Sequence, residues 1–218
     1  MSCTICNVRK ERRFCLALHE RICPQCCGEQ REATIDCPSE CSYLRQAREH
    51  EKPRRLEDLP AEELFSGINL TETFVREQEA LVAGIVHTIT ELSQADRSLN
   101  DREVIGGLVN LVKSYQTLVS SGLVYDQAVP NLAEQALTER LRKLITEYRE
   151  LEHRHLGYAK LKDSDVLKTL VFVLRLAHTH TSGRPRSRAF LDAMKEQFPS
   201  RRPDASVGTE SGSRIILP

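Results

Sequence analysis

The sequence predicts a mainly α-helical protein, in which a small cysteine-rich module precedes a bundle of four to five helices. Two observations carry this prediction. All eight cysteines lie between Cys3 and Cys41, and the rest of the chain repeats apolar residues at helical spacing with almost no strand signals. We expect the cysteine-rich module at 1–52, a linker at 53–68, the helical bundle at 69–198 and a flexible tail at 199–218.

Composition excludes several classes of protein. The 218 residues suit one ordinary domain and a small accessory one, and 31 basic side chains balance 31 acidic ones, so net charge gives no general argument for a nucleic-acid binder. No apolar run approaches the roughly 18 residues of a membrane-spanning helix, and the first residues lack the apolar stretch of a signal peptide. We expect a cytoplasmic protein without membrane association.

The cysteine spacing indicates metal binding. Cys3 with Cys6, and Cys23 with Cys26, form two Cys-x2-Cys pairs, the spacing at which a tight turn points two sulfur atoms at one ion. Together they predict one four-sulfur zinc site. The remaining cysteines predict a second, interleaved site, with His19 as an alternative ligand in place of Cys15 or Cys27; its sulfur ligands would be Cys15, Cys27, Cys37 and Cys41. The expected cofactor is therefore Zn²⁺, two ions per chain.

The small size of this segment favours structural zinc over the alternatives. A domain of this length seldom folds on its apolar core alone, so coordination has to supply the missing stabilisation. Disulfides would require an oxidising compartment, and an iron–sulfur cluster usually has three cysteines in one tight run, which is absent here. A redox Cys-x2-Cys would lie at a strand–helix junction, whereas Cys3 is almost at the start of the chain.

The second half of the module is expected to end in a helix. Asp36 or Cys37 can cap it, Pro38 suits its first turn, and good helix formers continue to about Lys52. Cys37 and Cys41, four positions apart, would then lie on one helical face. The last two ligands would thus come from the start of a helix.

The stretches CPQCCGEQR and CPSECSYLRQARE, within the whole cysteine pattern, carry a resemblance. Over about the first 45 residues the pattern resembles the two-zinc, cross-braced or treble-clef modules of the RING, MYND and HIT-finger kind. The adjacent Cys26 and Cys27 depart from those families position by position. Both stretches are also similar to N-terminal segments of uncharacterised bacterial proteins. The resemblance implies contacts with proteins or nucleic acids, and it implies no ligase activity.

Helical periodicity governs the remainder. Asn69-x-x-Glu72 and Asn100-x-x-Glu103 resemble capping boxes that open two helices, and Gly122 ends the second. A third helix is expected to begin at 130–132 and to end near Gly157. A fourth helix, capped by Asp163 or Ser164, is apolar on nearly every side and should be the most buried. Residues 187–198 are expected to form a short fifth helix. Short connections make sequential helices antiparallel.

Two arginine-rich segments allow two interpretations. Their side chains either remain solvated and neutralise thiolates, or they contact nucleic-acid phosphates. The candidate nucleic-acid residues are Arg9, Lys10, Arg12, Arg13, Arg184, Arg186 and Arg188.

No catalytic residue is predicted. Glu150-x-x-His153 and Glu152-x-x-His155 match a di-metal pattern by letter, but the apolar stripe of their helix leaves them on the outer face. We therefore expect a non-catalytic zinc-binding adaptor with a protein partner or self-association, without a small-molecule substrate; the alternative is a nucleic-acid-associated zinc-finger factor. The apolar segment 215–218 is either a frayed end or a docking peptide.

Overall fold

The computed structural model describes residues 1–52, 54–124 and 131–198, and its fold is mainly α-helical, as predicted. The predicted tail at 199–218, with its apolar end at 215–218, lies outside the described residues. The elements in chain order are β1 (Arg13–Cys15), β2 (Glu20–Ile22), α1 (Pro24–Gln30), α2 (Ser42–His50), the 3₁₀ helix η1 (Leu56–Asp58), α3 (Glu72–Glu77), α4 (Glu79–Ala95), α5 (Asp101–Ser121), α6 (Leu132–Leu156), α7 (Asp163–His180) and α8 (Ala189–Gln197).

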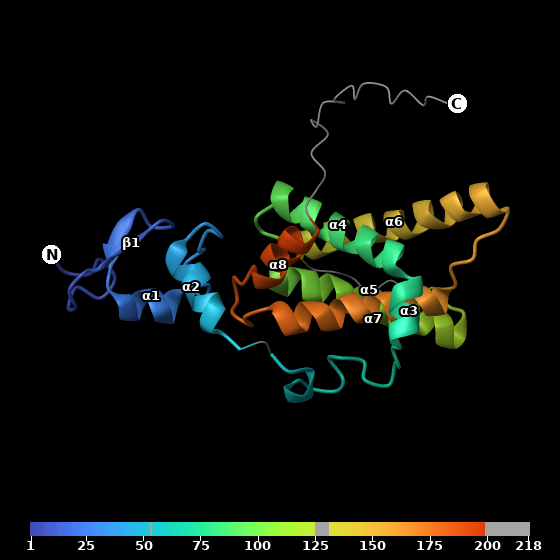
Figure 1. The fold of residues 1–218 in the computed structure, drawn as a ribbon, viewed down its shortest axis with the longest axis horizontal. Coiled ribbons are helices and arrows are strands. Elements are labelled where there is room, and N and C mark those ends of the chain that lie inside the picture. The colour runs from blue at the N-terminus through green and yellow to red at the C-terminus, as the bar shows by residue number, and fades with distance from the viewer. Residues whose placement is uncertain (53, 125–130, 199–218) are drawn as a thin grey trace, which may run out of the picture.

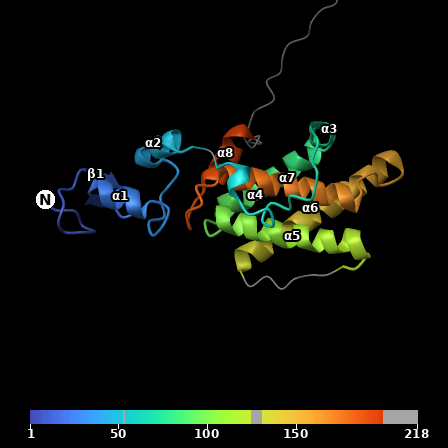
Figure 2. The ribbon, with the colours of Figure 1, turned by 90° about the horizontal axis from the view of Figure 1, so that it is seen from below.

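The molecule has two parts arranged end to end. The cysteine-rich module, with the β1–β2 hairpin, α1 and α2, lies at one end, and the helical bundle forms the other (Figures 1 and 2). The two strands pair antiparallel, with Phe14 opposite Arg21. None of the helices in the described ranges is long and apolar enough to cross a bilayer.

A single apolar core holds the bundle together. Helix α5 packs along α6 and α7, α4 packs on α6, and α8 covers one end of α4 and α7. Helix α7 has nine buried residues, against eight in α4 and seven in α5, which confirms the prediction that it is the most buried helix. The largest fully buried side chains of the bundle are Leu81, Ile85, Ile89, Leu108, Leu111, Leu137, Leu141, Ile145, Leu170 and Phe190.

Sequence signals place most helix ends correctly. The Asn100 side chain accepts a hydrogen bond from the backbone N–H of Arg102 and caps α5. Gly122 and Gly157 end α5 and α6 with φ angles of 73° and 79°, the left-handed conformation that favours glycine.

The first bundle helix starts differently from the prediction. Thr71, not Asn69, is its N-cap, because the Thr71 hydroxyl oxygen accepts a hydrogen bond from the Phe74 N–H at 3.2 Å. The helix is also interrupted at Gln78, where α3 ends and α4 begins. At the fourth helix the N-cap is Lys162, one residue before the predicted Asp163.

The predicted linker packs partly on the bundle. Arg175 on α7 donates hydrogen bonds to the carbonyl oxygens of Leu64, Phe65 and Ile68 at 2.8–2.9 Å. Leu64 itself is buried. One guanidinium therefore fastens the second half of this segment along α7.

A polar contact joins the cysteine-rich module to the bundle. Glu32, which follows α1 with a φ of 51°, is 1% exposed, and its carboxylate accepts from Arg48 at 2.6 Å and from Ser182 at 3.1 Å. Arg48 also donates to Asp192 on α8 at 2.7 Å. The same carboxylate of α8 accepts from Ser39 at 2.8 Å. Buried and half-buried charges thus contribute to holding the docked module.

Candidate metal centre

Two short backbone turns bring the first four predicted ligands together. Cys3 and Cys6 flank a turn in which the Asn7 N–H donates to the Cys3 carbonyl oxygen at 2.8 Å, and Asn7 has a left-handed φ of 54°. Cys23 is the N-cap of α1, Pro24 occupies its first position, and Cys26 follows within the same turn. The knuckle and the helix start therefore face each other, as the spacing predicted.

The sulfur geometry fits a tetrahedral ion. The Sγ atoms of Cys3, Cys6, Cys23 and Cys26 all lie within 4.8 Å of one another, and three of these residues are buried. Zinc–sulfur bonds of about 2.3 Å place the corners of a tetrahedron about 3.8 Å apart, which agrees with this spacing. In the described part of the chain this is the one group of three or more potential ligands that is so close.

Hydrogen bonds favour thiolates at this site. Arg9 donates to Cys23 Sγ at 3.3 Å and to Cys26 Sγ at 3.4 Å, and the Cys26 N–H donates to Cys23 Sγ at 3.4 Å. The last bond and the Arg9 guanidinium lower the pKa of Cys23 to about 6. Backbone N–H groups of Arg9 and Val8 lower the pKa of Cys6.

Complete ionisation of the same cluster is unfavourable without a cation. The Arg9 hydrogen bond lowers the pKa of Cys26, but burial and the neighbouring sulfurs outweigh it and raise that pKa to about 12. Four thiolates within one cluster repel one another, and a single guanidinium offsets part of that repulsion. A divalent ion would supply the missing positive charge, so the donor set fits zinc.

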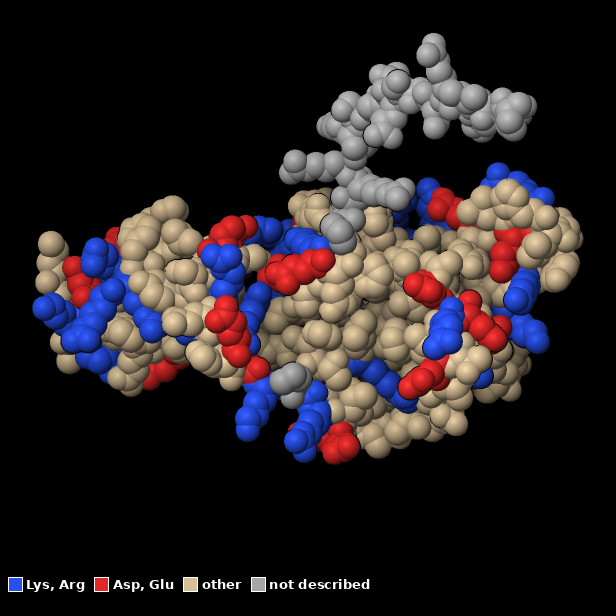
Figure 3. Space-filling view, in the orientation of Figure 1, with Lys and Arg blue, Asp and Glu red and all other residues tan. Residues whose placement is uncertain are grey.

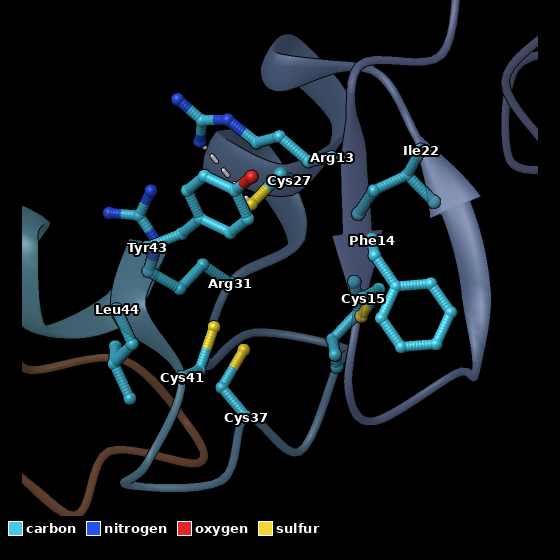
Figure 4. A pocket seen from close by; sticks show the side chains of 11 residues that line it. Arg13, Phe14, Cys15, Ile22, Cys27, Arg31, Cys37, Cys41, Tyr43 and Leu44 are labelled. Atoms are coloured by element: carbon cyan, nitrogen blue, oxygen red, sulfur yellow. Dashed lines mark hydrogen bonds between the residues drawn. The ribbon is translucent and has the colours of Figure 1, made fainter.

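The four cysteines predicted for the second site also lie together, but less tightly. Cys15, Cys27, Cys37 and Cys41 line one small cavity of about 20 Å³ between the hairpin, α1 and α2 (Figure 4). The Cys37 and Cys41 side chains lie side by side in that view, with both sulfur atoms pointing in the same direction. The four sulfurs do not all lie within 4.8 Å of one another, which distinguishes this set from the first tetrad.

Charge around this cavity follows the pattern of the first site. Arg13 donates to Cys27 Sγ at 3.5 Å, and its guanidinium lies 4.6 Å from the centre of the Tyr43 ring. Burial raises the pKa of Cys37, and the charges of Cys41 and Cys15 raise it further. The positions of these sulfurs are therefore close enough for their charges to interact, and a cation would relieve the repulsion.

The backbone around Cys37 differs from the prediction. Helix α2 begins at Ser42, and Cys41 is its N-cap, so Cys37 lies in the preceding loop rather than on a helical face. A turn precedes the helix, in which the Cys41 N–H donates to the Pro38 carbonyl oxygen at 3.0 Å. This turn, rather than a helical repeat, brings the two sulfurs to the same side.

His19 lies apart from both cysteine sets. It is exposed in the loop between β1 and β2 with a φ of 53°, and it does not line the cavity of Cys15 and Cys27. All eight cysteines fall within the described residues, and none forms a disulfide.

The predicted nucleic-acid residues have varied surroundings. Arg9 and Arg13 bind sulfurs, as described above. Arg184 donates to the carbonyl oxygens of Gly28 and Arg31 at 3.0 and 2.6 Å, and Arg188, 5% exposed, donates to three carbonyl oxygens at the α4–α5 turn. Lys10, Arg12 and Arg186 remain exposed.

The hairpin carries a feature that periodicity did not reveal. Four apolar side chains around β1 and the knuckle are exposed: Val8 at 85%, Phe14 at 46%, Leu16 at 41% and Leu18 at 42%. We call this set the hairpin patch. The available sequence signal was the spacing of Phe14, Leu16 and Leu18 at every second position. Because β1 and β2 are only three residues long, this signal covers too few positions to predict a strand.

The Glu-x-x-His pairs of α6 face outward, as expected. Glu150, His153 and His155 are exposed, and Glu152 accepts hydrogen bonds from the N–H groups of Lys160 and Leu161 at 2.9 and 2.8 Å. Glu152 therefore stabilises the turn after α6.

Comparison of the chain with models of protein families, with curated proteins and with solved structures found no match. The arguments for function therefore come from the residues themselves.

Proposed function

We propose that this protein is a non-catalytic adaptor, in which a module folded around two zinc ions presents the hairpin patch to a partner protein. The observation that carries the proposal is the exposure of the hairpin patch, whose strand β1 lies at the end of the molecule away from the bundle (Figure 1). Four exposed apolar side chains within the eleven residues 8–18 favour a protein-interaction site there. The eight free thiols favour a reducing compartment such as the cytoplasm.

Charge suggests which partner suits the patch. Lys10 and Arg12, which precede Phe14 by four and two residues, are exposed, whereas Arg21, opposite Phe14 on β2, lies 3.4 Å from Glu11. The outer end of the module shows more blue than red surface in Figure 3. We propose an extended or helical segment of another protein that combines apolar side chains with acidic ones.

The arginines argue against the nucleic-acid alternative. Arg9, Arg13 and Arg188 donate to sulfur or carbonyl acceptors within the molecule, so their guanidinium groups already have partners. A phosphate-binding surface needs such groups free, because affinity grows with each phosphate that is neutralised. Three of the seven predicted residues remain exposed, which is a small electrostatic footprint.

The second zinc ion is part of the proposal. Cys15, Cys27, Cys37 and Cys41 surround a cavity of about 20 Å³, which is space for one small ion or water. Sulfur ligands and an adjacent guanidinium from Arg13 repeat the composition of the first tetrad. Small movements of the four side chains would bring their sulfurs to tetrahedral spacing around an ion.

Metal content tests the ligand assignment. We expect two zinc ions per chain by elemental analysis of the purified protein, one in Cys26→Ser, one in Cys27→Ser and two in His19→Ala. An unchanged count in Cys27→Ser would contradict the second site. Loss of an ion in His19→Ala would replace the sulfur ligand set with one that contains imidazole.

Peptide selection tests the adaptor function. From a random peptide library displayed on phage, we expect the zinc-loaded protein to enrich sequences that combine apolar and acidic residues. Binding should fall at least tenfold in the double variant Leu16→Ser, Leu18→Ser, because the apolar contact area is lost. Leu151→Ser is the matched control, since Leu151 is 45% exposed on α6 at the other end of the molecule.

Two outcomes would overturn the adaptor proposal. Selected peptides that bind the double variant as well as the parent protein would place recognition elsewhere. Failure to select any peptide, together with RNA or DNA binding that weakens steeply with salt, would establish the nucleic-acid alternative.

A further inference from the structure

A pocket of different chemistry lies between the linker and the bundle. It has a volume of about 320 Å³ and is built by three segments far apart in the sequence. The lining residues are Arg54, Leu59 and Glu63 of the linker, Arg102 and Ile105 of α5, His178 of α7, and Thr181, Gly183, Arg184 and Pro185 after α7. This volume lies at the lower end of the range for small-molecule sites.

Three arginines converge on this pocket, opposed by one glutamate. Arg54 lies against the loop after α7, with Nη1 2.8 Å from where a Cβ of Gly183 would stand. Arg184 is fixed in place by the two carbonyl oxygens of the zinc module that it binds through Nη1. The Arg184 guanidinium is therefore positioned before any ligand arrives, and the Arg54 guanidinium lies close to the same loop.

The third arginine stands where a cation is least stable. Arg102 is exposed in the first turn of α5, and the partial positive charge at a helix N-terminus disfavours a cation there. Three guanidinium groups around one cavity also repel one another. An anion in the pocket would reverse both unfavourable effects.

His178 supplies a neutral polar group at the same wall. It is 6% exposed, and its Nε2 has no hydrogen-bond partner among the described residues. Burial lowers the pKa of His178, and the nearby Arg54 acts in the same direction while Glu63 opposes it. The ring therefore carries no charge that would compete with the arginines at neutral pH, and its Nε2 is a buried polar atom without a hydrogen-bond partner at the wall of the pocket.

We propose that this pocket binds a small phosphorylated molecule, with its phosphoryl group between Arg54, Arg102 and Arg184. Guanidinium groups bind phosphoryl oxygens through paired, charge-assisted hydrogen bonds. Leu59 and Ile105 offer an apolar wall to the uncharged part of the ligand, beside the His178 ring. This site is separate from the zinc ligands, and the inference goes beyond the adaptor function.

Calorimetric titration of the full zinc-loaded chain tests the proposal. The probes are inorganic phosphate, ribose 5-phosphate and ribose. We expect both phosphoryl probes to bind and ribose not to bind. Tighter binding of ribose 5-phosphate than of inorganic phosphate would identify a phosphate ester as the ligand class, and equal binding would identify free phosphate. Absence of heat from both phosphoryl probes at millimolar concentration would overturn the site.

A charge-matched pair of variants keeps the test specific. Arg102→Ala should weaken ribose 5-phosphate binding about tenfold or more, the usual effect of losing a charge-assisted hydrogen bond. Arg154 is exposed near the C-terminal end of α6 and does not line the pocket, so Arg154→Ala should leave binding unchanged. Equal weakening by both variants would overturn the pocket in favour of general surface charge. Arg54→Ala repeats the test at a second exposed residue, in case Arg102→Ala does not fold.

Discussion

The two ends of this molecule are held together by different means. The bundle has one continuous apolar core that draws side chains from α4 to α8. In the cysteine-rich module the buried cluster contains five residues, and three of them are Cys3, Cys23 and Cys26. Burial of hydrocarbon stabilises the first region, whereas the second buries few apolar side chains and, on our proposal, depends on coordination. Perturbations that distinguish these two mechanisms should therefore act on one end and spare the other.

Metal removal should give the largest effect and the clearest separation. A structural zinc site contributes on the order of 10 kcal/mol to folding, so a strong chelator under reducing conditions should unfold residues 1–50. The bundle contains no predicted ligand and should keep its helices. Hydrogen–deuterium exchange measured by mass spectrometry would show lost protection in β1, β2 and α1, with protection retained in α5 and α7. Retained protection in the module would contradict the role assigned to the metal.

A core substitution in the bundle should give the opposite pattern. Leu170→Ala removes a side chain that is 0% exposed, and we expect a loss of about 2–5 kcal/mol in the free energy of unfolding. Denaturant titration measures this loss, and zinc content per chain should stay unchanged. Leu132→Ala is the control, because Leu132 is 80% exposed and should change stability by less than about 0.5 kcal/mol. Zinc loss in Leu170→Ala would show that the two ends are not independent.

A third change should separate the two ends while leaving both folded. Arg48→Met removes the 2.7 Å ion pair with Asp192 of α8 and leaves the Glu32 carboxylate, buried beside Ser182, without a cationic partner, at a cost of about 3 kcal/mol to the docked arrangement. We expect faster hydrogen exchange in α8 and in the loop at 182–188, with zinc content retained. Arg45→Met on the same helix is exposed and serves as the control. Equal exchange in the two variants would show that the Glu32 contact does not hold the module in place.

The smallest effect should come from the arginine beside the first tetrad. Arg9→Gln removes the hydrogen bonds to Cys23 and Cys26 Sγ, and outer-shell partners of metal ligands typically change affinity 10- to 100-fold. We expect a loss of about tenfold in zinc affinity, measured by competition with a chromogenic chelator. Lys10→Gln changes the charge of an adjacent exposed residue and should leave affinity unchanged. A similar loss in both variants would indicate a general charge effect.

Local sequence signals predicted the bundle well. The α5 and α6 ends follow from Asn100, Gly122 and Gly157, whose preferences depend on a single turn of backbone. The wide apolar coverage of α7 likewise predicted its burial. The predicted start of the first helix was less accurate, since Asn69 and Thr71 are both good caps and the choice between them depends on packing of the preceding linker.

The candidate site was predicted in part, for a similar reason. The Cys-x2-Cys spacing is local and predicted the first tetrad, which the structure brings together. The second set is brought together by a turn at Pro38 and by three chain segments, whose relative positions the spacing of cysteines does not encode. Tetrahedral spacing of its four sulfur atoms stays a prediction. The phosphoryl pocket draws arginines from positions as far apart as Arg54 and Arg184, so no linear motif marks it, and the sequence suggested no small-molecule site.

The Glu32 contact has a consequence for the order of folding. Glu32 and its partner Ser182 are 150 positions apart, and Arg48 and Asp192 are separated by 144. Closing a loop of this length is slow compared with the formation of turns and helices. Ser182 and Asp192 also leave the ribosome long after the cysteines do. Attachment of the amino-terminal module should accordingly be a late event in refolding, observable as a separate kinetic phase that Arg48→Met abolishes.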